Sequence, residues 1–228
     1  MEEDSGFLFA FKLYVENKDP GIDWIEHMVQ RLTHSDIIHV EMISAIRQTS
    51  RGGPEDDQQQ RLFFASSTAH TAYVGSGYRE HQSRHSLTDS SYMHVFVPVH
   101  DEGDMRLALS FLHSLQGKRY NYLALPLTML PHHCKYRAIQ NLHTCFSTSK
   151  IFCSQMGLML CYLCNMLDPE QHIHNQSVFF DPVCCTPADL YSLLMSGNPH
   201  AVHCRPEEIV LLTTTSSAPN SSCYLHYI

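Results

Sequence analysis

The stretch IFCSQMGLMLCYLCNML (Ile151–Leu167) places a cysteine where an extended segment turns into an apolar helix. The nearly continuous apolar run after Ile151 and Phe152 predicts a helix over Cys153–Leu167, with its apolar side anchored in the core. A thiolate in the first turn of a helix faces free backbone N–H groups and the positive end of the helix dipole, which lower its pKa. The same N–H groups can stabilise an oxyanion during acyl transfer. The alternative interpretation is that Cys153 is a small buried hydrophobe, as most cysteines are.

A second decisive stretch, IIHVEMISAI (Ile37–Ile46), predicts a strand. Because side chains alternate along a strand, His39 and Glu41 share one face, while Val40 and Met42 lie on the other. An imidazole and a carboxylate on one face can serve as a general base and the group that orients it. The alternative is a half-exposed strand on which both side chains meet water.

The rest of the chain predicts an α+β fold with an antiparallel sheet and the helix of Cys153 packed on it. Strands are expected over 6–15, 61–67, 72–78 and 92–99, and helices over 23–32, 104–115 and 187–195, the last begun by Thr186 with Pro187 at its first position. Strands clustered before helices favour this class over alternating βαβ units. We expect one domain over 1–212, followed by a loose Ser/Thr-rich tail over 213–228.

Composition excludes several classes of function. The formal net charge of −8 argues against a nucleic-acid binder and against a polybasic membrane-surface protein. No apolar run reaches the roughly 20 residues that a transmembrane helix needs, and the acidic N-terminus is unlike a secretory signal. We therefore expect an intracellular, cytoplasmic protein whose nine cysteines are mostly thiols. Nothing in the sequence indicates an oligomeric state.

Three further patterns of cysteine and histidine are explained more simply by packing or by chance placement than by a functional site. Cys161, Cys164, His172 and His174 have part of the spacing of a zinc site, but the cysteines fall within the predicted helix and are expected to pack in the core. The vicinal pair Cys184–Cys185 invites a redox role, for which packing is the simpler explanation. The 17 histidines are scattered. We predict no metal and no cofactor.

Five stretches, taken in order, carry a resemblance to a known family. They are THSDIIHVEM (33–42), FFASSTAHTAYVG (63–75), GKRYNYLAL (117–125), IFCSQMG (151–157) and CCTPADLY (184–191). An early histidine strand, a tyrosine segment and a late cysteine helix resemble the circularly permuted NlpC-type papain-like superfamily. This group includes YiiX-like hydrolases, the lecithin–retinol acyltransferase group and relatives encoded by large DNA viruses.

The resemblance implies a papain-like fold of the permuted NlpC type with Cys153 as nucleophile and His39 as base. The third catalytic role is assigned to Glu41, with Ser66 in reserve, because many members carry a polar residue on the strand after the histidine. Asn121 and Gln155 stand where the family commonly has Asp and Glu.

The activity implied is that of a thiol hydrolase, either a peptidase or amidase, or of an acyltransferase. Its substrate would be a peptide amide or a lipid ester, and its location the cytoplasm, including that of a virus-infected host cell. The alternative is a catalytically inactive copy of the fold that binds a protein or a lipid through its weakly charged surface.

Overall fold

The structure is a computed structural model that describes residues 6–15, 23–45, 63–68, 77–81, 85–138, 149–167 and 178–204. The tail predicted over 213–228 lies outside these residues, as do His172, His174 and the part of a predicted strand before Gly77. The single domain expected over 1–212 stays a prediction.

A six-stranded antiparallel sheet with the strand order β10-β5-β1-β2-β3-β4 forms the centre of the molecule. Its strands are β1 (Gly6–Leu13), β2 (Ile37–Ala45), β3 (Phe63–Thr68), β4 (Gly77–His81), β5 (Tyr92–Pro98) and β10 (Val202–Cys204). Two small sheets lie outside it, β6 (Arg119–Tyr120) with β8 (Lys150–Ile151), and β7 (Tyr136–Ala138) with β9 (Val178–Phe180).

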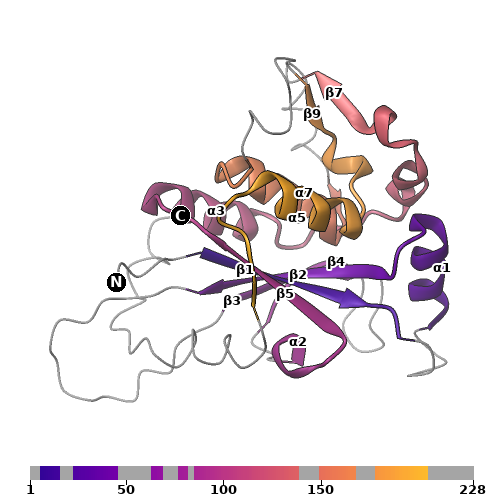
Figure 1. Ribbon diagram of the computed structural model, residues 1–228, viewed down its shortest axis with the longest axis horizontal. Helices are drawn as coiled ribbons and strands as arrows, with labels where there is room; N and C mark the ends of the chain where they lie inside the picture. Colours follow the sequence, from indigo (N-terminus) through magenta and orange to yellow (C-terminus); the bar gives the residue numbers. More distant parts are fainter. Residues whose placement is uncertain are drawn as a thin grey trace, which may run out of the picture.

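Three helices cover one face of the central sheet, as Figure 1 shows. They are α3 (Glu102–Ser114), α5 (Cys153–Leu163) and α7 (Pro187–Gly197). The short α2 (His85–Thr88) lies on the opposite face, and α1 (Asp23–Thr33) stands at one end of the sheet. The described residues also form three 3₁₀ segments. Two of them lie between β6 and β7, and the third lies between β9 and α7: η1 (Tyr122–Met129), η2 (His132–Lys135) and η4 (Pro182–Cys184). The predicted mixture of helices with an antiparallel sheet is confirmed.

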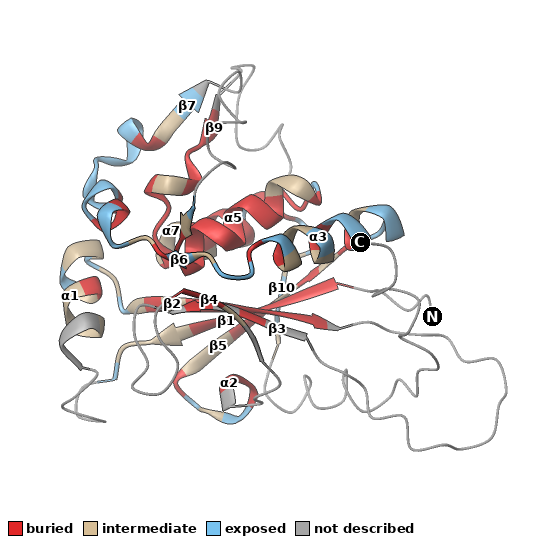
Figure 2. Ribbon diagram, turned by 180° about the vertical axis from the view of Figure 1, so that it is seen from behind, coloured by how far each residue is buried: buried red, intermediate tan, exposed pale blue. Residues whose placement is uncertain are grey.

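The alternation of β1 explains why the sheet is covered on both faces. Phe7, Phe9 and Phe11 are fully buried against the helices, whereas Leu8 and Ala10 belong to a smaller cluster with Leu87 of α2 on the other face. A strand that is apolar on both faces needs other elements packed on both faces of its sheet. Figure 2 shows this burial concentrated on the central strands and on α5.

The end of α5 differs from the prediction, which extended the helix to Leu167. The helix stops at Leu163 with Cys164 as its C-cap, because Asn165 adopts a left-handed conformation with φ 49°. The amide of Met166 then donates to the carbonyl of Cys161 at 2.9 Å, as in a Schellman turn. Asparagine tolerates this conformation, so a polar residue inside an apolar run ends the helix.

Other boundaries differ for local reasons. Helix α3 begins at Glu102 rather than Asp104, because the carboxylate of Asp101 caps it by accepting from the amides of Gly103 and Asp104. Gly117, with φ 78°, lies shortly after the end of this helix. Strand β3 (Phe63–Thr68) extends one residue beyond the predicted end at 67, and β4 (Gly77–His81) extends three residues beyond the predicted end at 78. The starts of both predicted strands lie outside the described residues. The single turn α2 lies between the strands predicted over 72–78 and 92–99, and β6–β10, of two or three described residues each, are too short to show a period.

Candidate active site

Cys153 is the first residue of α5, as its sequence context predicted. Phe152 occupies the N-cap position in an extended conformation and offers no side-chain hydrogen bond to the helix. A hydrogen bond to the segment before α7 fixes the first turn of α5: the buried hydroxyl of Ser154 donates to the carbonyl of Cys185 at 2.7 Å. Because Phe152 has no hydrogen-bonding side chain, the N-cap residue leaves the amide groups at the start of α5 uncapped.

The sulfur lies where two strands of the central sheet separate. The pairing of β2 with β3 runs from Ser44–Phe63 to Glu41–Ser66, while β3 continues alongside β4 as far as Thr68–Gly77. At this fork the backbone amide of Val40 donates a hydrogen bond to the sulfur of Cys153. The hydroxyl of Ser67 donates to the carbonyl of Ile151 at 2.9 Å and so fixes the segment that leads into the cysteine.

His39 reaches Cys153 from the same strand. The two side chains are hydrogen-bonded to each other, and Nε2 of His39 lies 3.8 Å from Oε1 of Glu41. The side chains of His39 and Glu41 are 16% and 12% exposed, so both keep some contact with solvent. The structure thus brings together the three side chains that the sequence singled out, across more than 110 residues of chain.

The electrostatics of this group favour an ion pair between sulfur and imidazole. Burial alone lowers the pKa of His39, but the Cys153 sulfur and the Glu41 carboxylate outweigh it and raise that pKa to about 10. Burial raises the pKa of Cys153, but His39 and the amides of Val40 and Ser154 outweigh it and bring that pKa below its ordinary value. Each partner stabilises the charged form of the other.

Other cysteines in the described part of the chain show the opposite behaviour. Burial raises the pKa of Cys161 and Cys185 well above the ordinary value, and that of Cys164 and Cys184 to about 12. All four are buried, and no histidine in the described part of the chain contributes to the pKa shift of any of them. Cys153 differs from these cysteines in the direction of its pKa shift because it lies beside a histidine, and not because it is buried.

Tyr120 is a neighbour of the group that sequence reasoning did not select. It belongs to β6, is 7% exposed, and its pKa is raised by burial, by the Cys153 sulfur and by Tyr122. The amide of Asn121 donates to the carbonyl of Ile151 at 3.2 Å, which holds this segment beside the strand that precedes the cysteine. Its signal in the sequence is its place in GKRYNYLAL (117–125), directly before Asn121.

Ser66 and Gln155, two further residues singled out in the sequence, also have definite places. Ser66 pairs through its backbone with Glu41 on the neighbouring strand. Gln155 is fully buried in the first turn of α5, and no described residue hydrogen-bonds its amide group.

The competing cysteine patterns lie elsewhere. Cys161 and Cys164 are buried at the far end of α5, where the thiol of Cys164 donates to the carbonyl of Asp104 at 3.4 Å. Cys184 and Cys185 are buried between η4 and α7, and their thiols donate to the Asp181 carboxylate and to the carbonyl of Thr186. Each of these cysteines is buried in the interior, which confirms the expectation that they pack there.

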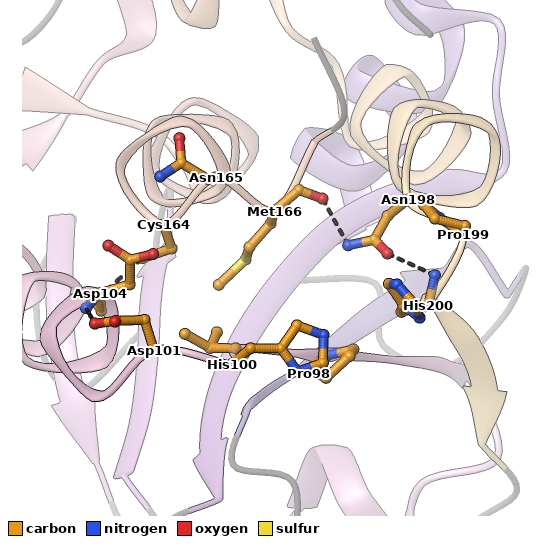
Figure 3. A pocket seen from close by; sticks show the side chains of 11 residues that line it. Pro98, His100, Asp101, Asp104, Cys164, Asn165, Met166, Asn198, Pro199 and His200 are labelled. Carbon is orange, nitrogen blue, oxygen red and sulfur yellow. Dashed lines mark hydrogen bonds between the residues drawn. The ribbon is translucent and has the colours of Figure 1, made fainter. Parts of the chain in front are cut away.

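A cavity of about 310 Å³ opens at the C-terminal end of α5 (Figure 3). His100, Asp101, Asp104, Cys164 and His200 are among the residues that line it. Because α5 has 11 residues, this cavity lies roughly 15 Å from Cys153 along the helix. It is therefore separate from the Cys153–His39 pair.

Comparisons of the chain with protein-family models, with curated proteins and with solved structures found no match. Within the described residues, no helix combines the length and the apolar content needed to cross a bilayer.

Proposed function

We propose that this chain is a cysteine-dependent hydrolase or acyltransferase with Cys153 as nucleophile, His39 as base and Glu41 as the residue that orients the base. We further propose that its fold is the permuted NlpC-type papain-like arrangement. The observation that carries the proposal is the hydrogen-bonded pair of Cys153 and His39 at an uncapped helix start, with opposite shifts of the two pKa values.

The reaction follows from the positions of these groups. The Cys153 thiolate attacks an acyl carbonyl, and backbone N–H groups at the start of α5 stabilise the oxyanion. The His39 imidazolium gives its proton to the leaving alcohol or amine, which leaves a thioester on Cys153. His39 then takes a proton from water or from an acceptor alcohol or amine, which attacks the thioester and releases the acyl group.

A catalytically inactive binding module with the same fold is the second candidate. The observation that favours it is the low exposure of the nucleophile, since Cys153 is only 3% exposed. A sulfur buried to this degree needs an opening beside His39 before an acyl group can reach it.

Thiol labelling separates the two candidates. Cys134 is an exposed free cysteine, whereas Cys153 is buried. If Cys153 is an activated nucleophile, iodoacetamide at neutral pH modifies it faster than Cys134, as read by peptide mass spectrometry. Modification in order of exposure, with Cys134 first, would instead support the binding module.

The matched variant is Cys153→Ser, which keeps the size and hydrogen bonding of the side chain. It should lower the hydrolysis of a soluble activated ester at least about 10³-fold, because a serine beside this histidine lacks a thiolate. Wild-type rates in this variant would sink the catalytic proposal.

A further inference from the structure

The segment after Tyr120 presents an unusual apolar face. Among the described residues, five of the eight exposed large hydrophobic side chains lie between positions 122 and 130. They are Tyr122, Leu123, Leu127, Met129 and Leu130, which we call the η1 face. Leu123 is 77% exposed and Met129 is 52% exposed, values that are costly for apolar side chains in water.

The η1 face is held rigidly outward. Ala124, Leu125 and Thr128 are buried on the inner side of η1, which packs against α1 and η4. The hydroxyl of Thr128 donates to the carbonyl of Leu125 at 2.6 Å. In Figure 2 the segment rises beside α1 toward β7 and is largely coloured as exposed. Because the inner side is anchored, the η1 face cannot turn into the core.

The η1 face is continuous with the candidate active site. The rings of Tyr120 and Tyr122 lie 4.9 Å apart, and Tyr120 is the tyrosine beside the Cys153 sulfur. The edge of the η1 face at Tyr122 is therefore in ring contact with the tyrosine that neighbours the nucleophile.

Charge around the face points to the kind of partner. Residues 121–131 contain no charged side chain, whereas Lys118, Arg119, His132 and His133 flank them. Arg119, His132 and His133 are exposed. An apolar face with a tyrosine at its edge and the exposed guanidinium of Arg119 beside it matches the layers of a phospholipid surface, in which acyl chains lie below phosphates. The net charge of −8 disfavours an anionic bilayer.

The backbone of η1 is unsuited to a peptide ligand. Extended peptides commonly bind by adding a strand to an open sheet edge. Here the carbonyls of Asn121 and Leu127 already accept from the amides of Ala124 and Leu130, and Pro126 has no N–H to offer. The face provides aliphatic side chains but no free strand edge.

We propose that the η1 face docks on the surface of a zwitterionic phospholipid bilayer and that the substrate of Cys153 is a lipid acyl ester. The second half of this statement rests on the proposed function. The Cys153 thiolate attacks the ester carbonyl, the C–O bond breaks, and the lipid alcohol leaves with the proton of His39. Water, deprotonated by His39, then hydrolyses the thioester and releases the fatty acid.

Flotation of the full-length protein with phosphatidylcholine vesicles tests the docking. Wild-type protein should float with the vesicles, and the double variant Leu123→Asp/Met129→Asp should partition at least about tenfold more weakly. The matched control is Leu107→Asp on α3, because Leu107 is 47% exposed but lies outside the η1 face. It should float like the wild type.

Two outcomes overturn the docking: wild-type protein that stays with the lipid-free fractions, or a double variant that floats unchanged. A wild-type dimer in light scattering that the double variant splits would assign the η1 face to a second copy and overturn it as well.

The substrate half is tested with two esters. Wild-type protein should release fatty acid from an ester embedded in the vesicles, and the double variant should do so at least about tenfold more slowly while hydrolysing a soluble short-chain ester unchanged. Equal loss on both esters would overturn the lipid assignment. Failure of the proposed function is distinguishable, because Cys153→Ser protein should still float even if it and the wild type release no acid.

Discussion

Helices α5 and α7 begin side by side, and their first turns use the same backbone groups in opposite ways. In α7 the hydroxyl of Thr186 accepts from the amide of Asp189 at 2.9 Å, and the Asp189 carboxylate accepts from the amide of Thr186 at 2.9 Å. In α5 no side chain caps the turn, and the Cys153 sulfur accepts from the amide of Ser154. The free N–H groups of a helix start thus stabilise the fold in α7 and a thiolate in α5.

Each of these turns also carries a charge pair. In α7 the Asp189 carboxylate lies 2.7 Å from Nζ of Lys135, whose side chain is only 7% exposed. In α5 the corresponding pair is Cys153 with His39. Both pairs place an anion at the positive end of a helix dipole, where it is stabilised. Only the pair in α5 consists of a nucleophile and a base, and this difference defines the candidate site.

The largest effect is expected when the α5 pair loses its cation. With a folded-state pKa below the ordinary value of 9.0, Cys153 stays a thiolate as pH falls toward that lowered pKa, and His39 stays protonated up to about 10. The labelling rate of Cys153 should therefore be nearly flat between these two values. In His39→Ala the pKa of Cys153 rises to at least the ordinary value of 9.0, so labelling below that pH should slow by about tenfold for each unit by which the pKa rises. Iodoacetamide rates measured from pH 5 to 10 check this.

Two milder variants identify the third residue of the group. Glu41→Gln keeps the shape of the carboxylate and removes its charge, so labelling below the ordinary pKa of Cys153 should slow, and by less than in His39→Ala. Ser66→Ala, on the strand that pairs with Glu41, should leave the rate unchanged. If Ser66→Ala slows labelling and Glu41→Gln does not, the assignment of the third role reverses.

An intermediate effect is expected when the α7 pair loses its anion. Asp189→Asn leaves the buried Lys135 ammonium without its carboxylate, and should lower the free energy of unfolding by about 2–3 kcal/mol. Urea denaturation measures this change. The control is Asp189→Asn combined with Lys135→Met, which should recover part of the loss because no uncompensated charge remains. A double variant that is less stable than the single one would contradict the ion-pair explanation.

The same two helices indicate what sequence alone could predict. The starts of both were predicted at the correct residue, because Pro187 after Thr186 and an apolar run after Cys153 are local signals. The shared face of His39 and Glu41 also followed from strand alternation. These are the parts of the candidate site that depend only on neighbours in the sequence.

What the sequence could not provide was the pairing between distant segments. The fork at which β3 leaves β2 frees the amide of Val40 for the sulfur, and nothing in either strand marks it. The place of Tyr120 beside Cys153 depends likewise on β6 pairing with β8. Strand pairing is set by the assembled core, so long-range register has no local signature.

The smallest effect is expected from the cap of α7 itself. Thr186→Ala removes the hydroxyl that accepts from the amide of Asp189, and should lower the free energy of unfolding by about 1 kcal/mol in urea denaturation. Thr33→Ala is the matched control, because the Thr33 hydroxyl donates to the carbonyl of Val29 inside α1 and caps nothing, so its loss should cost less. Labelling of Cys153 should stay within about twofold of wild type in both variants. A slower reaction in Thr186→Ala would mean that the start of α7 also orders the start of α5, through the carbonyl of Cys185 that Ser154 binds.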